Sequence, residues 1–246
     1  SDVDFETAEK MVDLAYQNGV NYFDTAYPYH DGESEKFLGR ALKKYDRDSF
    51  YLATKMPVWL CNSWEDMERT FNEQLERLQV DYFDFYLLHA FTDDRAEHYK
   101  KVNAYEFVKQ KKAEGKIRHM GFSFHGGEPL LAQLLEDYQW DFVQLQLNYI
   151  DWDLIKAKRL YEMVTAKGLP IVVMEPVRGG YLAGFNDTVD GIFKASAPDA
   201  SIASWALRWV ASLPNVRVVL SGMSAIEQVE DNLKTFEDFK PLTEEE

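Results

Sequence analysis

The sequence predicts a (β/α)8 TIM barrel, formed as a single domain over residues 1–246. Short apolar runs alternate with amphipathic segments along the whole chain, as expected where helices connect parallel strands that are buried on both faces. No glycine fingerprint of the GxGxxG type follows any of these runs, which disfavours an open dinucleotide-binding sheet. The closed barrel is therefore the better prediction.

Each element is predicted from its own pattern. Strands are expected at seven near-continuous apolar runs, residues 20–26, 50–55, 83–89, 117–124, 142–148, 170–176 and 216–222. Helices are expected between them, at residues 5–18, 33–44, 63–79, about 98–114, 128–137, 153–167, 199–212 and 225–234. Glycines after Asn18 and Lys167 mark two helix ends, and Ser63 before two acidic residues marks a helix start.

The predicted strands are one short of a closed barrel. A barrel of this class needs eight strands, and the sequence shows seven. We expect the first strand to precede residue 1, because an unpaired strand edge beside the core would be costly.

Composition limits the function classes. There are 27 Lys and Arg against 42 Asp and Glu, for a net charge of −15, which repels nucleic acid. No apolar run approaches the ~18 residues of a membrane span, and the acidic start lacks the pattern of a secretory signal. Cys61 is the only cysteine, so neither a disulfide nor a thiolate cluster is expected. We predict a cytoplasmic protein without a metal site, monomeric or a small homo-oligomer, that binds neither nucleic acid nor membrane.

Polar residues end all seven predicted strands. In barrels, chemistry collects at the C-terminal ends of the strands, and buried polar groups are costly unless they pair with each other or with a ligand. Seven such residues favour a site over seven separate turn residues. They are Asp24, Lys55, His89, Ser123, Gln144, Glu175 and Ser221.

Three of these residues combine with a loop tyrosine into a carbonyl-reducing site. Tyr29 follows Asp24 by five positions and can protonate a developing alkoxide. The ammonium of Lys55 stabilises a phenolate, and Asp24 keeps that ammonium charged and oriented. His89 can donate a hydrogen bond to the substrate oxygen. The hydride has to come from a nicotinamide, so we predict reduction of a small-molecule aldehyde or ketone to an alcohol, with Tyr29 as the proton donor.

Three other functions fit parts of the pattern. A Schiff-base aldolase would use Lys55, although a paired Asp24 would keep that lysine charged. A metal-dependent hydrolase would use His89, His125, Asp24 and Glu175, although no His-x-His pair ends a strand. A non-catalytic or slow cofactor-binding subunit that senses redox state is also open.

The segment GVNYFDTAYPYHDGESEKFLG (19–39) resembles the signature of the aldo-keto reductase superfamily, in which Asp and Tyr stand five apart. Lys55 in LATKMP and His89 in FYLLHA follow in the family's order. LATKMPVWL, MGFSFHGG, VVMEPVRGG and VVLSGMSAIEQVEDNL are similar to a bacterial and archaeal branch, many of whose members carry a C-terminal iron–sulfur segment. One cysteine cannot ligate such a cluster, so none is expected within this chain. An electron-transfer partner is one interpretation of this resemblance.

The resemblance implies a (β/α)8 reductase that binds NADP(H) without a Rossmann fold. Asp24, Tyr29, Lys55 and His89 match the catalytic tetrad. The positions that match cofactor-binding residues are Ser123 and Gln144 at the carboxamide, Met174 at the nicotinamide ring, and Gly222, Met223, Gln228, Asp231 and Asn232 at the adenosine end.

The chain departs from the family pattern at several cofactor positions. Phe124 stands where the family often has Asn, and Met174 stands where a tyrosine often stacks on the nicotinamide. Gly222 and Gln228 stand where Lys and Arg are frequent. A 2′-phosphate requires such charges, so NAD(H) is an alternative cofactor to NADP(H).

Overall fold

The computed structural model describes residues 4–246, which divide into two compact units. The first unit is Gly19–Gln144, and the second combines the described residues up to Asn18 with Leu145–Glu246. The two units are described separately below.

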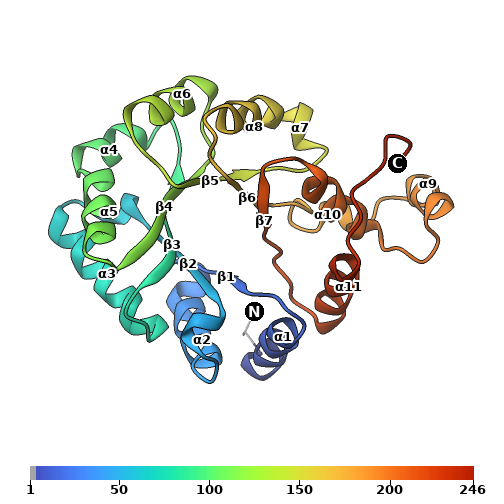
Figure 1. Cartoon of the computed structure of the whole chain (residues 1–246), viewed down its shortest axis with the longest axis horizontal. Coiled ribbons are helices and arrows are strands. Elements are labelled where there is room, and N and C mark those ends of the chain that lie inside the picture. Colours follow the sequence, from blue (N-terminus) through green and yellow to red (C-terminus); the bar gives the residue numbers. More distant parts are fainter. Residues whose placement is uncertain (1–3) are drawn as a thin grey trace. The chain divides into compact units, whose positions relative to one another are not determined.

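Parallel strands form the sheet of the first unit (Figure 1). Strand β1 pairs with β2, β2 with β3, and β3 with β4, each in parallel. Asp24 lies opposite Ala53, and Lys55 lies opposite Leu87. The C-terminal ends of these strands therefore lie along one edge of the sheet, as predicted. Their bounds are β1 Tyr22–Asp24, β2 Tyr51–Met56, β3 Phe83–Phe91 and β4 Ile117–Phe124, with β5 beginning at Phe142.

Helices flank these strands. They are α2 Glu33–Leu42, α3 Trp64–Leu78, α4 Ala96–Lys101, α5 Ala104–Ala113 and α6 Glu128–Asp137. The Ser63 side chain caps α3 by accepting a 3.1 Å bond from the Asp66 N–H, as predicted. The single helix expected at 98–114 was wrong: Asn103 has φ +58° and separates α4 from α5. Asparagine tolerates this left-handed conformation, which helical periodicity does not reveal.

Close packing of α2 on α3 places polar residues beneath β2. A Cβ on Gly39 would lie 2.3 Å from the backbone oxygen of Arg77, so only glycine permits this approach. On the other side, α3 covers the sheet with the fully buried Phe71, which contacts the rings of Phe83 and Tyr86. Helix α2 is thereby held close enough for Glu35 to reach the strand that carries Lys55.

The second unit contains the remaining strands and helices. Strand β6 pairs with β7 in parallel, with Val173 opposite Val219. The elements are α1 Phe5–Gln17, β5 (Phe142–Gln146, shared with the first unit), α7 Asp151–Leu154, α8 Ala157–Ala166, β6 Ile171–Met174, α9 Asp187–Ser196, α10 Ile202–Ser212, β7 Val216–Val219 and α11 Ile226–Glu237. All seven predicted strands are therefore present in residues 4–246, and the strand expected before residue 1 stays a prediction.

Two helix predictions in this unit were wrong. The helix expected at 153–167 is divided, because Lys156 adopts φ +57° between α7 and α8. Helix α9 was not predicted, although Asn186 caps it by accepting from two backbone N–H groups. Val189, Ile192 and Phe193 have helical spacing, but Asp190 and Gly191 within the same segment have low helix propensity. Across the described residues, no helix has both the length and the hydrophobicity to cross a membrane.

Candidate active site

An ion pair between neighbouring strands forms the base of the candidate site. Lys55 on β2 is fully buried, and its Nζ lies 2.7 Å from Oδ1 of Asp24 on β1. The same ammonium donates a 2.7 Å hydrogen bond to the backbone oxygen of Thr25. Burial raises the pKa of Asp24, and the charge of Lys55 opposes that rise. Each charged group thus depends on the other, because neither is otherwise compensated in a low-dielectric surrounding.

Tyr29 lies over this ion pair. The turn after β1 carries it in a short 3-10 helix, Tyr29–Gly32, in which three residues adopt left-handed φ angles of 51° to 89°. The Nζ of Lys55 is 5.0 Å from the centre of the Tyr29 ring. The tyrosine remains 39% exposed, so solvent reaches this side chain.

His89, near the end of β3, lies between two aromatic rings. Its ring centre is 5.8 Å from that of Tyr29 and 5.1 Å from that of Trp59. Burial, followed by the charges of Lys55, His125 and Arg95, lowers the pKa of His89 to about 3. Its Nδ1 is buried with no hydrogen-bond partner among the described residues. The imidazole is therefore neutral near pH 7.

The four predicted catalytic residues come together within the first unit. Asp24 contacts Lys55, Lys55 lies against Tyr29, and the rings of Tyr29 and His89 meet nearly edge to face. A phenol beside a buried ammonium, with a neutral imidazole next to it, can bind a carbonyl oxygen and supply a proton to it.

A buried network beneath Lys55 was not predicted. Glu35 Oε1 accepts hydrogen bonds from the Thr54 hydroxyl (2.6 Å) and from Gln74 Nε2 (2.8 Å). Gln74 also donates to the backbone oxygen of Lys55 at 2.9 Å and accepts from the Tyr86 hydroxyl at 2.6 Å. All five residues are fully buried, so the network holds β2 in place at Lys55.

The sequence does carry a signal for part of this network. Gln74 lies three residues after Phe71 and four before Leu78, on the buried face of α3. A polar residue in such a stripe needs a partner. That signal indicates a buried hydrogen bond without identifying the partner.

Two of the predicted cofactor residues also lie in the first unit. Ser123 and Gln144 are both buried, on β4 and β5. Ser123 Oγ accepts a 2.8 Å hydrogen bond from the N–H of Ala90, a residue with φ +51° that directly follows His89. The hydroxyl keeps its own proton to donate, and a glutamine amide can both donate and accept. These groups fit the hydrogen-bonding needs of a nicotinamide carboxamide.

The other predicted cofactor residues lie in the second unit. Met174 ends β6, Gly222 and Met223 lie in the loop after β7, and three follow on α11. All three are engaged within the chain: Gln228 Oε1 accepts from Ser224 N (2.7 Å), Asp231 Oδ2 from the Ser201 hydroxyl (2.5 Å), and Asn232 Nδ2 donates to Ser221 Oγ (2.8 Å). Residues 221–233 contain neither Lys nor Arg.

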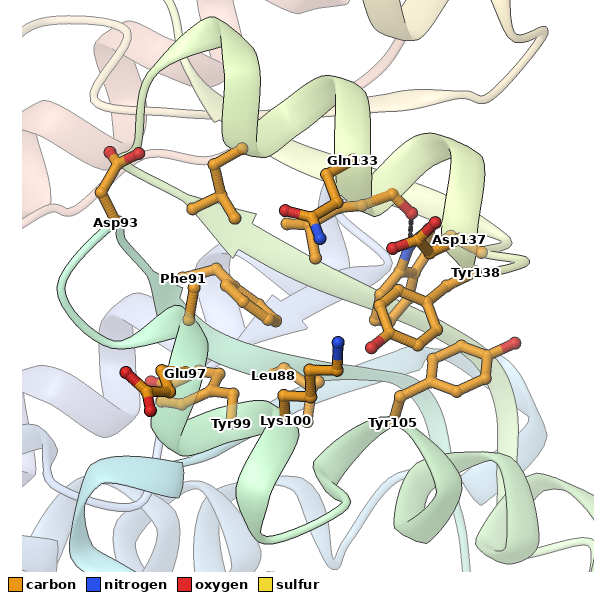
Figure 2. Close-up of a pocket in the computed structure, with 14 residues that line it drawn as sticks. Leu88, Phe91, Asp93, Glu97, Tyr99, Lys100, Tyr105, Gln133, Asp137 and Tyr138 are labelled. Carbon is orange, nitrogen blue, oxygen red and sulfur yellow. Dashed lines mark hydrogen bonds between the residues drawn. The ribbon is translucent and has the colours of Figure 1, made fainter.

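A cavity of about 330 Å³ in the first unit is separate from these residues. It lies between β3, α4, α5 and α6, and none of the four catalytic candidates lines it. Figure 2 shows Tyr105 and Tyr138 side by side at one end of this cavity, Asp93 at the other, and the Lys100 amine directed into it. Within residues 4–246, no three His, Cys, Asp or Glu side chains are grouped so that they could hold a metal ion.

Parallel strands that alternate with helices, with Asp24, Lys55 and His89 at or near strand ends and Tyr29 in the turn after β1, are the arrangement expected of a barrel oxidoreductase. The chain belongs to the aldo/keto reductase family, whose family model matches residues 1–246. It is an NAD(P)H-dependent carbonyl reductase by family.

Solved and curated relatives agree with this assignment. The aldo-keto reductase AKR11C1 of Bacillus halodurans, in its holo form, is 26% identical with a TM-score of 0.81, covering 99% of this chain and 86% of its own. An aldo/keto reductase from Klebsiella pneumoniae in complex with NADP and acetate is 26% identical with a TM-score of 0.78, at 98% and 83% coverage. The NADH-specific methylglyoxal reductase of Escherichia coli K12 is 25% identical over 94% of this chain and 83% of its own. The predicted (β/α)8 fold class is confirmed.

Proposed function

We propose that this protein reduces the carbonyl of a small aldehyde or ketone, with Tyr29 donating the proton to the oxygen. The observation that supports this role is the buried Lys55–Asp24 ion pair directly under the Tyr29 ring. A positive charge at that position stabilises the phenolate that remains after proton transfer. The ion pair also weighs against the Schiff-base aldolase, which requires a neutral lysine.

His89 is the other group that could act as the acid. With a pKa of about 3, only about one imidazole in 10⁴ is protonated at pH 7, which makes it a poor proton donor. A neutral imidazole still donates one hydrogen bond. We therefore assign His89 to binding and orienting the carbonyl oxygen, and Tyr29 to the proton.

For the cofactor, we propose NADP(H), with NAD(H) as the alternative. The bound nicotinamide would supply the hydride. Ser123 and Gln144 would hold its carboxamide, Met174 would lie against its ring, and Gly222, Met223, Gln228, Asp231 and Asn232 would hold the adenosine end. The NADP-bound Klebsiella relative supports NADP(H), and the E. coli relative, NADH-specific by name, supports the alternative.

A redox-sensing subunit with little turnover remains the second function, since it would bind the same cofactor. An electron-transfer partner, a single domain over residues 1–246, a cytoplasmic location, and a monomer or small homo-oligomer all stay predictions. Turnover of a carbonyl panel, followed by nicotinamide absorbance, separates the reductase from the sensor.

The decisive variant is Tyr29→Phe. Removing the hydroxyl should lower kcat by about 10²- to 10⁴-fold, the usual contribution of a positioned general acid, while cofactor affinity measured by fluorescence titration stays at the parental value. Tyr27→Phe is the matched control, because that hydroxyl lies in the same loop but donates to Glu73 at 2.6 Å. Parental turnover in Tyr29→Phe would show that the acid is wrongly assigned.

A further inference from the structure

Arg95 lies next to the candidate active site. It occupies the loop between β3 and α4, and its Cζ is 4.4 Å from the centre of the Trp59 ring. That ring in turn lies 5.1 Å from the ring of His89. One indole therefore connects the guanidinium to the imidazole that is proposed to bind the carbonyl.

The segments that carry Arg95 and Trp59 are fixed to each other. His98 on α4 uses its Nε2 to contact the backbone oxygens of Cys61 (2.8 Å) and Val58 (3.2 Å). Both oxygens belong to the turn that carries Trp59. The stack of Arg95 on Trp59 is thus formed before any ligand binds, and it needs little further ordering.

Arg95 differs from other arginines that stack on aromatic rings in this chain. Five such arginines each have a carboxylate within ion-pair distance: Arg47 with Asp84, Arg77 with Glu35, Arg118 with Asp84, Arg178 with Asp151, and Arg208 with Glu246.

No carboxylate in the described part of the chain pairs with Arg95. Its Nη1 donates a long hydrogen bond, 3.4 Å, to the backbone oxygen of Ala90, and Tyr99 is another polar neighbour. The adjacent Asp94 accepts a 2.5 Å hydrogen bond from the Thr92 hydroxyl, which lowers the pKa of this carboxyl, and the charge of Arg95 adds a smaller lowering without forming an ion pair. A guanidinium has five N–H donors, so Arg95 keeps most of its donors for a ligand.

The basic side chains around His89 contrast with the acidic composition of the whole protein. The net charge is −15, yet the charges that influence His89 come from Lys55, His125 and Arg95, all of them basic side chains. Because Asp24 neutralises Lys55, the guanidinium of Arg95 is the charge in this group that can pair with an anionic ligand.

We propose that Arg95 determines substrate specificity by binding an anionic group of the substrate, so that the protein acts on carbonyl compounds that carry a carboxylate or a phosphate. This inference rests on the proposed carbonyl reduction. Because Trp59 separates Arg95 from His89, the anionic group lies several atoms from the carbonyl. Succinic semialdehyde should therefore be a better substrate than glyoxylate, whose carboxylate adjoins the carbonyl.

The test compares kcat/KM for succinic semialdehyde, glyceraldehyde 3-phosphate, glyoxylate and butanal. The parent should favour one of the first two over butanal by about tenfold or more, as expected for a charge-assisted contact, and the preferred one identifies the anion. Arg95→Met keeps the stem against Trp59 but removes the charge, so this preference should disappear through KM while butanal changes less than about twofold. Equal rates on charged and neutral aldehydes in the parent would overturn the proposal, as would equal losses on both in Arg95→Met.

Arg118→Met is the matched control, because Arg118 also stacks on an aromatic ring, that of Tyr82, but lies at the opposite end of β4 from Ser123. If no aldehyde is reduced at all, the proposed carbonyl reduction is wrong. Calorimetric titration with succinate then still tests whether Arg95 binds an anion. Succinate binding that is lost in Arg95→Met and kept in Arg118→Met supports the anion site. Absent or equal binding overturns it.

Discussion

The ends of β1–β3 and the stretch from Ser221 to Asn232 are both proposed to handle ligand, but they are built differently. In the first region Lys55 is fully buried and the ion pair with Asp24 is supported from below by hydrogen bonds to β2. In the second region Gly222 and Gln228 are exposed, and the polar side chains bond mainly to their own loop and helix. The proposed catalytic end is thus fixed by burial, whereas the proposed adenosine end is held by surface contacts that single substitutions can change at little cost.

Asp24→Asn tests whether burial holds the first region in place. The change leaves the buried Lys55 ammonium without its anion, so we expect a loss of about 3–5 kcal/mol in the free energy of unfolding, together with a fall in kcat. Urea titration measures the first and steady-state assay the second.

Asp238→Asn provides the matched comparison in the second unit. The pair of Asp238 with Lys240 is 3.4 Å long, with both side chains more than three-quarters exposed, and such pairs contribute at most about 1 kcal/mol. If Asp24→Asn costs no more than this control, burial does not hold the catalytic end as described.

The next largest expected effect is the loss of folding stability when His89 is protonated in acid. Its pKa is about 3 in the folded protein against about 6.5 when unfolded, so the unfolded state binds more protons in between. The stabilising contribution is present above pH 6.5 and is lost as the pH falls toward 3. Between pH 6.5 and pH 4 the loss is about 3 kcal/mol.

The difference in the free energy of unfolding between the parent and His89→Asn, followed with pH, isolates this loss. Asp24, whose pKa is raised, acts in the opposite sense but is present in both proteins. Stability measured by urea titration at several pH values should fall more steeply in the parent. Parallel curves would mean that His89 is not held neutral by burial.

The contrast also explains what the sequence could predict. All seven strands and the residues at their ends follow from apolar runs that stop at a charged or polar residue, because such runs must be buried. Two helices were predicted as continuous, since the breaks at Asn103 and Lys156 depend on single left-handed backbone angles. Periodicity cannot detect these angles.

Contacts between distant elements were beyond the sequence. Gln74 could be recognised as a polar residue in a buried stripe, but its bonds to Glu35 and Lys55 depend on how closely α2 packs on α3. Arg95 likewise belongs to no sequence motif. Its proposed role as an anion-binding residue follows from its stacking on the Trp59 ring and from the absence of a paired carboxylate in the described chain.

The smallest expected effect concerns cofactor choice in the second region. Gln228 is exposed, and residues 221–233 supply no cation for a 2′-phosphate. Gln228→Arg should shift the ratio of NADPH to NADH affinity toward NADPH by about tenfold, the effect of one charge-assisted hydrogen bond. Fluorescence titration with each cofactor measures the ratio, and unfolding should change little because the site is on the surface.

Gln228→Met separates charge from structure in this experiment. Both substitutions remove the 2.7 Å bond that Gln228 accepts from the Ser224 N–H, but only arginine adds a positive charge. The methionine variant should keep the parental ratio, with both affinities falling together if the loop loosens. Identical ratios in the two variants would mean that the 2′-phosphate does not lie at position 228. The adenosine end would then be assigned to other residues of the second unit. Arg178 and Arg217 would be the first candidates, because each carries a positive charge.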